Sequence, residues 1–275
     1  HVLGPDHPMK PIRLRYVYEM LKSYGAFDAT NVDLIEPKKS CKEQILGFHI
    51  PEYVEAVAKF SSGRLPEYPS TFNLGAGDNP VYDGMYEAAL WSTGASLVGA
   101  DLLISGQAKV AMYVSGGLHH AMSDRASGFC VFNDPVIAIQ KLTQSGMRVA
   151  YVDIDCHHGD GVQAAFYDTD EVLTISVHES GAFIFPGTGD VNEIGVGNGR
   201  GYSVNLPLYP YTTDDTYMWS ICETVIPLLH AFQPDVLVTQ IGIDTHFLDP
   251  ITHLALTVQG FSEVVSQFSG VAPVS

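Results

Sequence analysis

VAYVDIDCHHGDG, residues 149–161, decides the fold, because a short apolar run ends abruptly in a cluster of polar side chains. Residues 149–154 are apolar on both faces except at Asp153, which is typical of a buried strand in a parallel sheet. Other short apolar runs also end in polar or glycine-rich sequence. We therefore expect four strands, over residues 110–114, 149–154, 172–177 and 236–241.

Helical patterns lie before, between and after these runs. The expected helices cover residues 13–23, 83–105, 134–145, 161–167, 214–232 and 258–268. Strands that alternate with helices predict a doubly wound α/β fold. The chain has 275 residues, which is enough for one large domain. We find no repeat or linker that would divide it, so we expect a single domain over residues 1–275.

Composition narrows the class of protein. The net charge is −17, from 31 acidic and 14 basic residues, whereas a nucleic-acid-binding protein needs a basic face. The acidity fits attraction for cationic substrates, although solubility alone would also explain it. No apolar run reaches the ~20 residues of a membrane-spanning helix. The four cysteines form no C-x-x-C pair, so we expect reduced thiols in a cytoplasmic protein, without direct nucleic-acid or membrane contact.

Histidine and aspartate gather where the expected strands end, and ligands of open parallel sheets bind beyond the carboxyl ends of the strands. The four strand ends are followed by His119 and His120; by Asp153, Asp155, His157, His158 and Asp160; by His178; and by Asp244 and Asp249. Singly, each could be a hydrogen-bonded structural residue. Together they predict a metal site, because uncompensated carboxylates at a sheet edge are costly.

The spacing within this set indicates which residues meet at the metal. Asp155 and His157 are two residues apart, so at a strand end they point the same way, and Asp244 can complete a set of three ligands. Three protein ligands with an open position are typical of catalytic zinc, although ferrous iron suits these ligands too. His119 and His120 would stand beside the metal-bound water, one of them as general base. Asp153 and Asp160 are available to hold their far nitrogens.

Several longer motifs then indicate a family. They are HPMKPIRLR from His7, GAGDNP from Gly75, SGGLHHA from Ser115, SGFCVFND from Ser127, YVDIDCHHGDGV from Tyr151, FPGTGDV from Phe185 and QIGIDTHFLDP from Gln240. In this order they resemble the histone deacetylase family, including its acetoin-utilisation and acetylpolyamine members. The resemblance covers almost the whole chain. It implies the three-layer arginase/deacetylase α/β fold, with a central, mostly parallel sheet flanked by helices.

The resemblance also implies a function and a role for each residue. The function is zinc-dependent removal of an acetyl or other acyl group from lysine side chains, in proteins or peptides, or from polyamines. The implied zinc ligands are Asp155, His157 and Asp244, with His120 as general base, His119 as its electrostatic partner, and Asp160 and Asp153 behind them. The implied substrate-binding residues are Phe129 and Phe185 as tunnel walls, Gly128 on the tunnel floor, Asp78 at the rim, and Arg13 in an internal acetate-release cavity. A potassium site is implied at Asp153, Asp155, His157, Ser176 and Val177, and a second, structural one at Phe166, Thr169, Val172 and Tyr202.

One family feature does not occur in these residues. The family carries a GGGY-type motif whose tyrosine donates a hydrogen bond to the developing oxyanion, but no tyrosine follows Tyr217. Loss of such a donor costs about 10²–10³ in rate. We expect that a C-terminal segment is missing, and that residues 1–275 alone fold poorly and deacetylate weakly. The alternative is a weak or inactive acyl-lysine-binding protein. A two-metal ureohydrolase is disfavoured, because it needs extra metal carboxylates. The physiological amine and the oligomeric state are not predicted.

Overall fold

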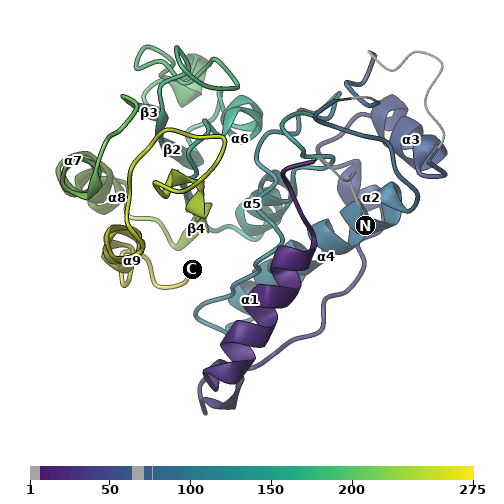
Figure 1. Ribbon diagram of the computed structural model, residues 1–275, viewed down its shortest axis with the longest axis horizontal. Coiled ribbons are helices and arrows are strands. Elements are labelled where there is room, and N and C mark those ends of the chain that lie inside the picture. Colours follow the sequence, from purple (N-terminus) through teal and green to yellow (C-terminus); the bar gives the residue numbers. More distant parts are fainter. Residues whose placement is uncertain (1–6, 64–70, 76) are drawn as a thin grey trace. The chain divides into compact units, whose positions relative to one another are not determined.

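The computed structural model describes residues 7–63, 71–75 and 77–275, and it contains two compact units (Figure 1). We call His1–Gly99 with Met112–Ile137 the helical unit, and Ala100–Ala111 with Ala138–Ser275 the sheet unit. Each unit is assembled from separate stretches of chain. Helices α4 (Met85–Ile104) and α5 (Asp134–Gln144) contribute residues to both units. The single catalytic domain stays a prediction.

The sheet unit is built on four parallel strands. They are β1 (Val149–Asp153), β2 (Val172–Glu179), β3 (Ser203–Leu208) and β4 (Val236–Gln240), in the order β3-β2-β1-β4. Three of the expected strands and the α/β class are thereby confirmed. Strand β3 was not expected, because its sequence SVNLPL mixes polar residues and a proline into a partly exposed edge strand. Since β1 lies between β2 and β4, the segments that follow these three strands leave the same edge of the sheet.

Helices complete the sheet unit. They are α6 (Asp160–Ala165), α7 (Asp214–Ser220), α8 (Ile226–Phe232) and α9 (Val258–Gln267), with a π-helical segment Ile221–Val225 between α7 and α8. The expected helix over 214–232 is therefore present with a π-helical interruption. Strand residues such as Ile175 pack with Tyr217 of α7 and Val264 of α9 in one buried core. Because the strands pack in this core, the segments that leave them start from fixed positions.

The expected strand over residues 110–114 is wrong. A strand needs a ladder of backbone hydrogen bonds, and among the described residues this segment pairs only at its beginning. The N–H of Ala111 donates to the Ser275 carbonyl over 2.9 Å, and the N–H of Ser275 donates to the Lys109 carbonyl over 2.8 Å. Val110 and Met112 remain largely exposed. The apolar run therefore reads as a buried strand in sequence but has no full-length partner here.

The helical unit contains α1 (Ile12–Ser23), α2 (Lys42–Ile45), α3 (Pro51–Phe60) and the first parts of α4 and α5. Helices α2 and α3 were not expected. Proline at the first position of α3 favours its start, because the missing N–H would have no partner there. Tyr53 of α3, Met85 of α4 and Phe132 form part of a second buried core. This core lies under the loops that carry the histidine pair.

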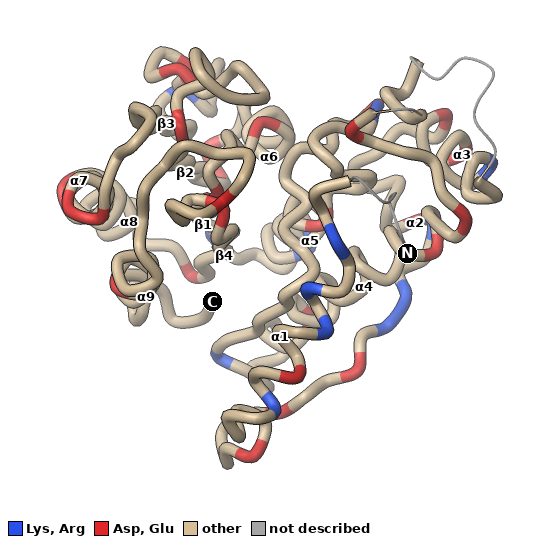
Figure 2. The backbone as a smooth tube through the Cα atoms, in the orientation of Figure 1, with Lys and Arg blue, Asp and Glu red and all other residues tan. Residues whose placement is uncertain are grey.

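Charge is divided unevenly between the units, as Figure 2 shows by colour. The sheet unit has four Lys and Arg residues against 17 Asp and Glu, which gives it a net charge of −13. The helical unit accounts for the remaining −4, and its basic residues include those on α1. No helix among the described residues is both long and apolar enough to cross a membrane. The acidity of the chain is thus concentrated in the unit that holds the carboxylates at the sheet edge.

Candidate functional site

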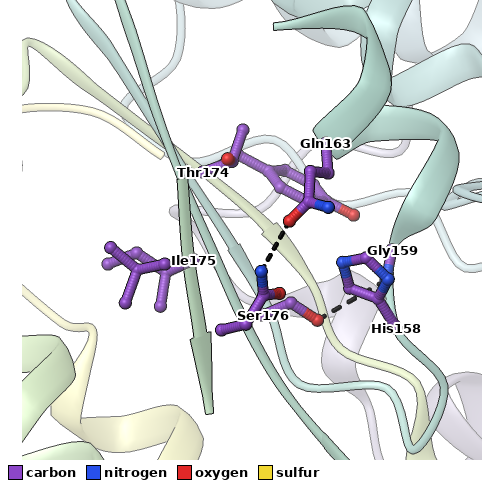
Figure 3. Close-up of a pocket in the computed structure, with 9 residues that line it drawn as sticks. His158, Gly159, Gln163, Thr174, Ile175 and Ser176 are labelled. Carbon is purple, nitrogen blue, oxygen red and sulfur yellow. Dashed lines mark hydrogen bonds between the residues drawn. The ribbon is translucent and has the colours of Figure 1, made fainter. Parts of the chain in front are cut away.

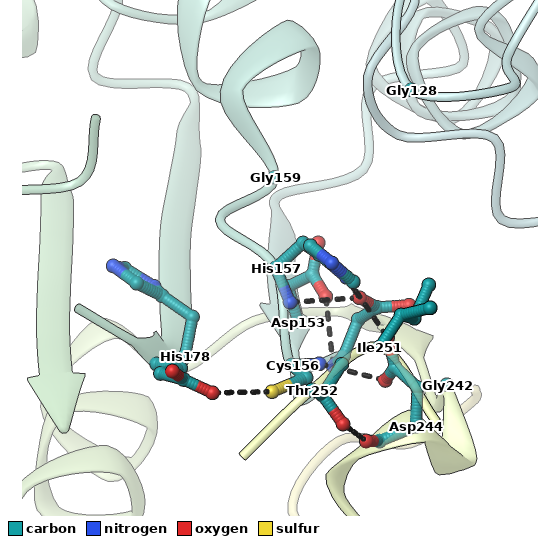
Figure 4. A network of polar contacts seen from close by, with 12 residues as sticks. Gly128, Asp153, Cys156, His157, Gly159, His178, Gly242, Asp244, Ile251 and Thr252 are labelled. Atoms are coloured by element: carbon teal, nitrogen blue, oxygen red, sulfur yellow. Dashed lines mark hydrogen bonds and ion pairs between the residues drawn. The ribbon is translucent and has the colours of Figure 1, made fainter. Parts of the chain in front are cut away.

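The three predicted metal ligands come together in the sheet unit, and Figure 4 shows two of them, His157 and Asp244, close to each other. Asp155 and His157 lie in the bend after β1, and Asp244 lies in the short 3₁₀ turn after β4. One potential ligand atom from each lies within 4.8 Å of the others. The Nδ1 atom of His157 is 3.1 Å from Oδ1 of Asp155 and 2.9 Å from Oδ2 of Asp244. The strand order thus brings together residues that are almost 90 positions apart.

The triad holds two carboxylates close together, and this affects the pKa values of its members. Burial and the charge of Asp155 raise the pKa of Asp244 to about 7. Burial lowers the pKa of His157, but hydrogen bonds and charge from Asp155 and Asp244 outweigh it and raise that pKa to about 10. A proton on His157 therefore offsets part of the negative charge. A divalent cation would do the same with two charges.

Main-chain groups and one amide hold the carboxylates in place. Asp155 accepts from the N–H of His157 over 2.9 Å and from Nε2 of Gln240 over 2.8 Å. Asp244 accepts from the N–H of Cys156 over 2.8 Å. At Gly242, a Cβ atom would lie only 2.2 Å from Oδ2 of Asp155, so only glycine fits there. Gln240 and Gly242 both belong to the motif QIGIDTHFLDP, but sequence reasoning assigned them no role.

The two carboxylates predicted to lie behind the histidine pair have partners of their own. Asp153 is completely buried and accepts from the hydroxyl of Tyr151 over 2.6 Å and from the N–H of Asp155 over 3.1 Å. Asp160 is buried at the start of α6. Both lie in the sheet unit, whereas the histidines that they were predicted to hold lie in the helical unit. These pairings stay predictions. Tyr151 was missed, although it stands two residues before Asp153 and so on the same face of the strand.

Phe185 is the predicted tunnel wall in this unit. It is 41% exposed, and its ring centroid lies 6.4 Å from that of His157. The loop that follows Phe185 is held by Glu193, whose carboxylate accepts from the N–H groups of Gly189 and Asp190 over 2.8 and 3.0 Å. An aromatic side chain that is exposed beside a polar centre is suited to contact an uncharged alkyl stem.

Residues of the two predicted potassium sites lie along β2 and its neighbours. Ser176 lines a small cavity of about 10 Å³ with His158, Gly159 and Gln163 (Figure 3). A cavity of this size holds at most about one water molecule and cannot take a substrate. The carbonyl of Val177 accepts from the hydroxyl of Tyr217 over 3.1 Å.

The second predicted potassium set is spread over three elements. Phe166 and Thr169 lie at and after the end of α6, Val172 begins β2, and Tyr202 precedes β3. The Tyr202 carbonyl accepts from the N–H of Thr174 over 2.9 Å. Neither potassium site is tested by these contacts, and both stay predictions.

The histidine pair lies in the helical unit, on a loop that follows no strand. His119 and His120 are 3% and 4% exposed, and their ring centroids are 3.9 Å apart. The carbonyl of His119 accepts from Nδ2 of Asn133 over 3.2 Å. The loop is anchored by Asp134, whose carboxylate accepts from the N–H groups of Gly117 and Leu118 over 3.1 and 2.9 Å.

Asp134 and Asn133 are residues that sequence reasoning missed. Asp134 is buried, and its burial raises the pKa of its carboxyl against the lowering effect of its hydrogen bonds, of which that from Ser96 is the largest. Asn133 is completely buried and holds the carbonyls on both sides of His120. The signal was the end of the motif SGFCVFND, which was read only as the start of a helix.

Phe129 and Gly128 form a tight turn in the same unit. Ser127 and Cys130 exchange two backbone hydrogen bonds across it, and both central residues have positive φ, +48° at Gly128 and +69° at Phe129. A bulky residue in the left-handed region costs about 1–2 kcal/mol. Such strain at a partly exposed aromatic ring points to a function for that ring. It supports the predicted tunnel wall without testing it.

Two other predicted substrate residues are exposed. Asp78 lies in a loop, and its carbonyl is 3.3 Å from Nε2 of His7. Its exposure suits the predicted rim position. Arg13 lies on α1, a helix with no buried residues. Its predicted place in an internal cavity therefore finds no support here, and the role stays a prediction.

Known proteins resemble this chain throughout its length. Residues 7–274 match the family described as the Histone deacetylase domain. The acetoin utilization protein AcuC of Bacillus subtilis is 42% identical over 266 residues, which are 96% of this chain and 68% of AcuC. Human histone deacetylase 1 is 39% identical over 265 residues, which are 95% of this chain and 54% of the human protein.

Solved structures show the same relationship. A histone deacetylase homologue in complex with SAHA has a TM-score of 0.91 at 29% identity, and a homologue from Aquifex aeolicus has a TM-score of 0.89 at 29% identity. Each comparison covers 99% of this chain and 73% of the solved one. The predicted three-layer deacetylase-type fold is thereby confirmed. The chain spans about half the length of the animal deacetylases that it matches. The match to the family over residues 7–274, together with this fold, shows that the chain belongs to the histone deacetylase family.

Proposed function

We propose that this protein is a metal-dependent deacetylase that hydrolyses the amide of an acetylated amine. The observation that carries the proposal is the convergence of Asp155, His157 and Asp244 at one edge of the sheet, in a chain of the histone deacetylase family. The relatives are named for acetoin utilisation and for histone deacetylation. Removal of an acetyl group from an amine is the reaction that best joins this site to those names.

The residues present fit a divalent cation. Two carboxylates and one imidazole are ligands that zinc and ferrous iron both accept, and three protein ligands leave a position open for water or substrate. Burial, and after it the charge of Asp155, raise the pKa of Asp244, and a bound cation would favour its charged form. We propose zinc as the metal, held by Asp155, His157 and Asp244. When bound, it would supply Lewis acidity and a water molecule of lowered pKa.

The chain's own residues supply the rest. We assign proton acceptance during hydrolysis to the imidazole of His120, with the adjacent ring of His119 modulating its charge. Phe129 and Phe185 are each assigned to contacts with the uncharged stem of the substrate. Asp78 is assigned to the substrate backbone.

An acetylated lysine or an acetylated polyamine is the proposed substrate class. Both have an uncharged amide on an alkyl stem, and both give a cationic amine as product. The sheet unit, with a net charge of −13, favours the approach of a molecule that is positively charged away from the reacting amide. Potassium, in the sites named above, would offset the remaining carboxylate charge.

The test is to measure zinc content and turnover in one preparation of the full chain. The substrates are an acetyl-lysine peptide and an acetylated polyamine, each with and without a hydroxamate chelator. We expect about one zinc per chain and turnover that the chelator abolishes, at a low rate because no tyrosine follows Tyr217. The variant Asp155→Asn should lose both, whereas Asp170→Asn, at an exposed carboxylate of the same unit, should keep both.

The outcomes separate the parts of the proposal. Absence of bound metal in the wild type would overturn the assignment of the three ligands. Stoichiometric zinc without turnover on either substrate would contradict the hydrolase. Turnover on one substrate alone would decide between lysine and polyamine.

A further inference from the structure

A buried glutamate stands at the end of β2, away from the three proposed ligands. Glu179 is completely buried, and its own N–H donates to the Cys156 carbonyl over 2.9 Å. Its carboxylate accepts from the N–H of His253 over 2.9 Å, lies 2.8 Å from Nδ1 of His253, and accepts from the thiol of Cys156 over 3.6 Å. A buried carboxylate is costly unless it is fully hydrogen-bonded. Its position at this point therefore calls for an explanation.

One connection leads from Glu179 to Asp244 through the loop after β4. His253 is held at both its N–H and its ring, and the preceding residue, Thr252, donates its hydroxyl to the Asp244 carbonyl. The His253 carbonyl in turn accepts from the N–H of Tyr211 over 2.7 Å. Because His253 is held in place, the preceding residue Thr252, which donates to the Asp244 carbonyl, is held in place as well.

A second connection leads through Cys156. The thiol of Cys156 donates to Glu179, and its N–H donates to Oδ1 of Asp244 over 2.8 Å (Figure 4). Glu179 therefore contacts both segments that meet at the metal site, the bend after β1 and the loop after β4. Any effect of Glu179 on the metal therefore acts through the positions of these two segments.

We propose that Glu179 and His253 form a positioning pair that orients Asp244 for metal binding. The inference rests on the proposed metal site. The His253 side chain is 48% exposed whereas that of Glu179 is completely buried, so one partner of this pair can be altered from the surface. Loss of the imidazole leaves a buried carboxylate short of a donor. The two loops then relax, and Asp244 loses its fixed orientation.

The experiment measures zinc affinity by competition with a chromophoric chelator, on the full chain freed of metal, alongside the melting temperature of the metal-free protein. We expect His253→Ala and Glu179→Gln to weaken zinc binding about 10- to 100-fold, as is typical for groups that orient ligands. His253→Asn should bind zinc almost as well as the wild type, because its Nδ2 can replace the Nδ1 donor. His230→Ala, at an exposed histidine of the same unit, should change nothing.

Cobalt provides a second readout, since the visible absorption of bound Co²⁺ reports the geometry of its ligands. We expect an altered spectrum for His253→Ala and a spectrum like that of the wild type for His253→Asn. Equal zinc affinity in wild type and His253→Ala would overturn the inference, and so would a lowered melting temperature at unchanged affinity. If the wild type itself bound no zinc, the proposed metal site would fail first, and Asp244→Asn would then behave like the wild type.

Discussion

The three proposed ligands and the histidine pair are held by two different kinds of structure. In the sheet unit, Asp155 and Asp244 follow adjacent strands and accept hydrogen bonds from neighbouring main-chain N–H groups. In the helical unit, His119 and His120 sit on a loop without a strand, anchored by the buried side chains Asn133 and Asp134. The sheet positions its residues through backbone contacts of adjacent strands, whereas the loop also draws on two buried side chains.

This difference has a consequence for how each region responds to mutation. A single substitution beside the end of a strand leaves the strand itself in place, because the buried core and the backbone hydrogen bonds of the sheet still hold it. A single substitution at Asp134 removes the hydrogen bonds that its carboxylate accepts from Gly117 and Leu118. We therefore expect metal binding and proton transfer to be separable by mutation, one in each unit.

The largest expected effect is a loss of activity that, depending on which unit is mutated, occurs with or without loss of zinc. His120→Ala should lower kcat/KM about 10²–10⁴-fold, because a general base is lost, while zinc content stays at the wild-type level. Asp244→Ala should lose zinc as well as activity. Metal analysis and steady-state kinetics on both variants check this. Loss of zinc from His120→Ala would show that the two regions do not act separately.

Removal of the loop anchor should have the next largest effect. Asp134→Ala deletes the acceptor for the N–H groups of Gly117 and Leu118, so the histidine loop should lose its order and kcat should fall about tenfold or more. Zinc affinity should not change. Asp124→Asn is the matched control, since that exposed carboxylate pairs with the exposed Arg125 and such pairs contribute about 0–1 kcal/mol. Unchanged kcat in Asp134→Ala would refute the anchor.

His49, in the helical unit, should make the stability of the protein depend on pH. Burial lowers the pKa of His49 to about 4, against the raising effect of the Met122 and Ser123 carbonyls. The unfolded chain takes up this proton near pH 6.5, before the folded one does. The free energy of unfolding should therefore fall by about 3 kcal/mol between pH 6.5 and 4.

Urea unfolding across this pH range checks the expectation. The variant His49→Gln should remove most of the slope, because its amide oxygen can still accept from the Asn133 N–H that now bonds the His49 ring. An equally steep slope in the variant would assign the acid sensitivity to other groups.

The smallest effect concerns the strained turn. Phe129→Gly relieves a positive φ, so the free energy of unfolding should stay the same or rise by up to about 1 kcal/mol, while KM for an acetyl-lysine peptide rises. Phe132→Ala, at a completely buried ring nearby, should instead cost about 3–5 kcal/mol. Thermal unfolding and KM measurements compare them. A large loss of stability in Phe129→Gly would make that ring a core residue.

Prediction from sequence succeeded where a pattern is local and failed where a partner is distant. The runs that form β1, β2 and β4 are continuous and apolar, so their side chains alone predict that these segments are buried. Strand β3 carries Asn205 and Pro207, and it is a strand because β2 lies beside it. Residues 110–114 show the reverse, since an apolar run without a full-length neighbour forms no ladder.

The sequence by itself determined the family, the α/β class and the residues Asp155, His157 and Asp244, because their spacing and surrounding motifs are written along the chain. Only the tertiary structure placed Gln240 beside Asp155, Asn133 and Asp134 beside the histidine loop, and Glu179 beside His253. Each of them acts on a residue 14 to 85 positions away, and such contacts leave no periodic signal in the sequence. They exist because strand order and the two cores bring separate segments together, which is a property of packing and not of any local pattern.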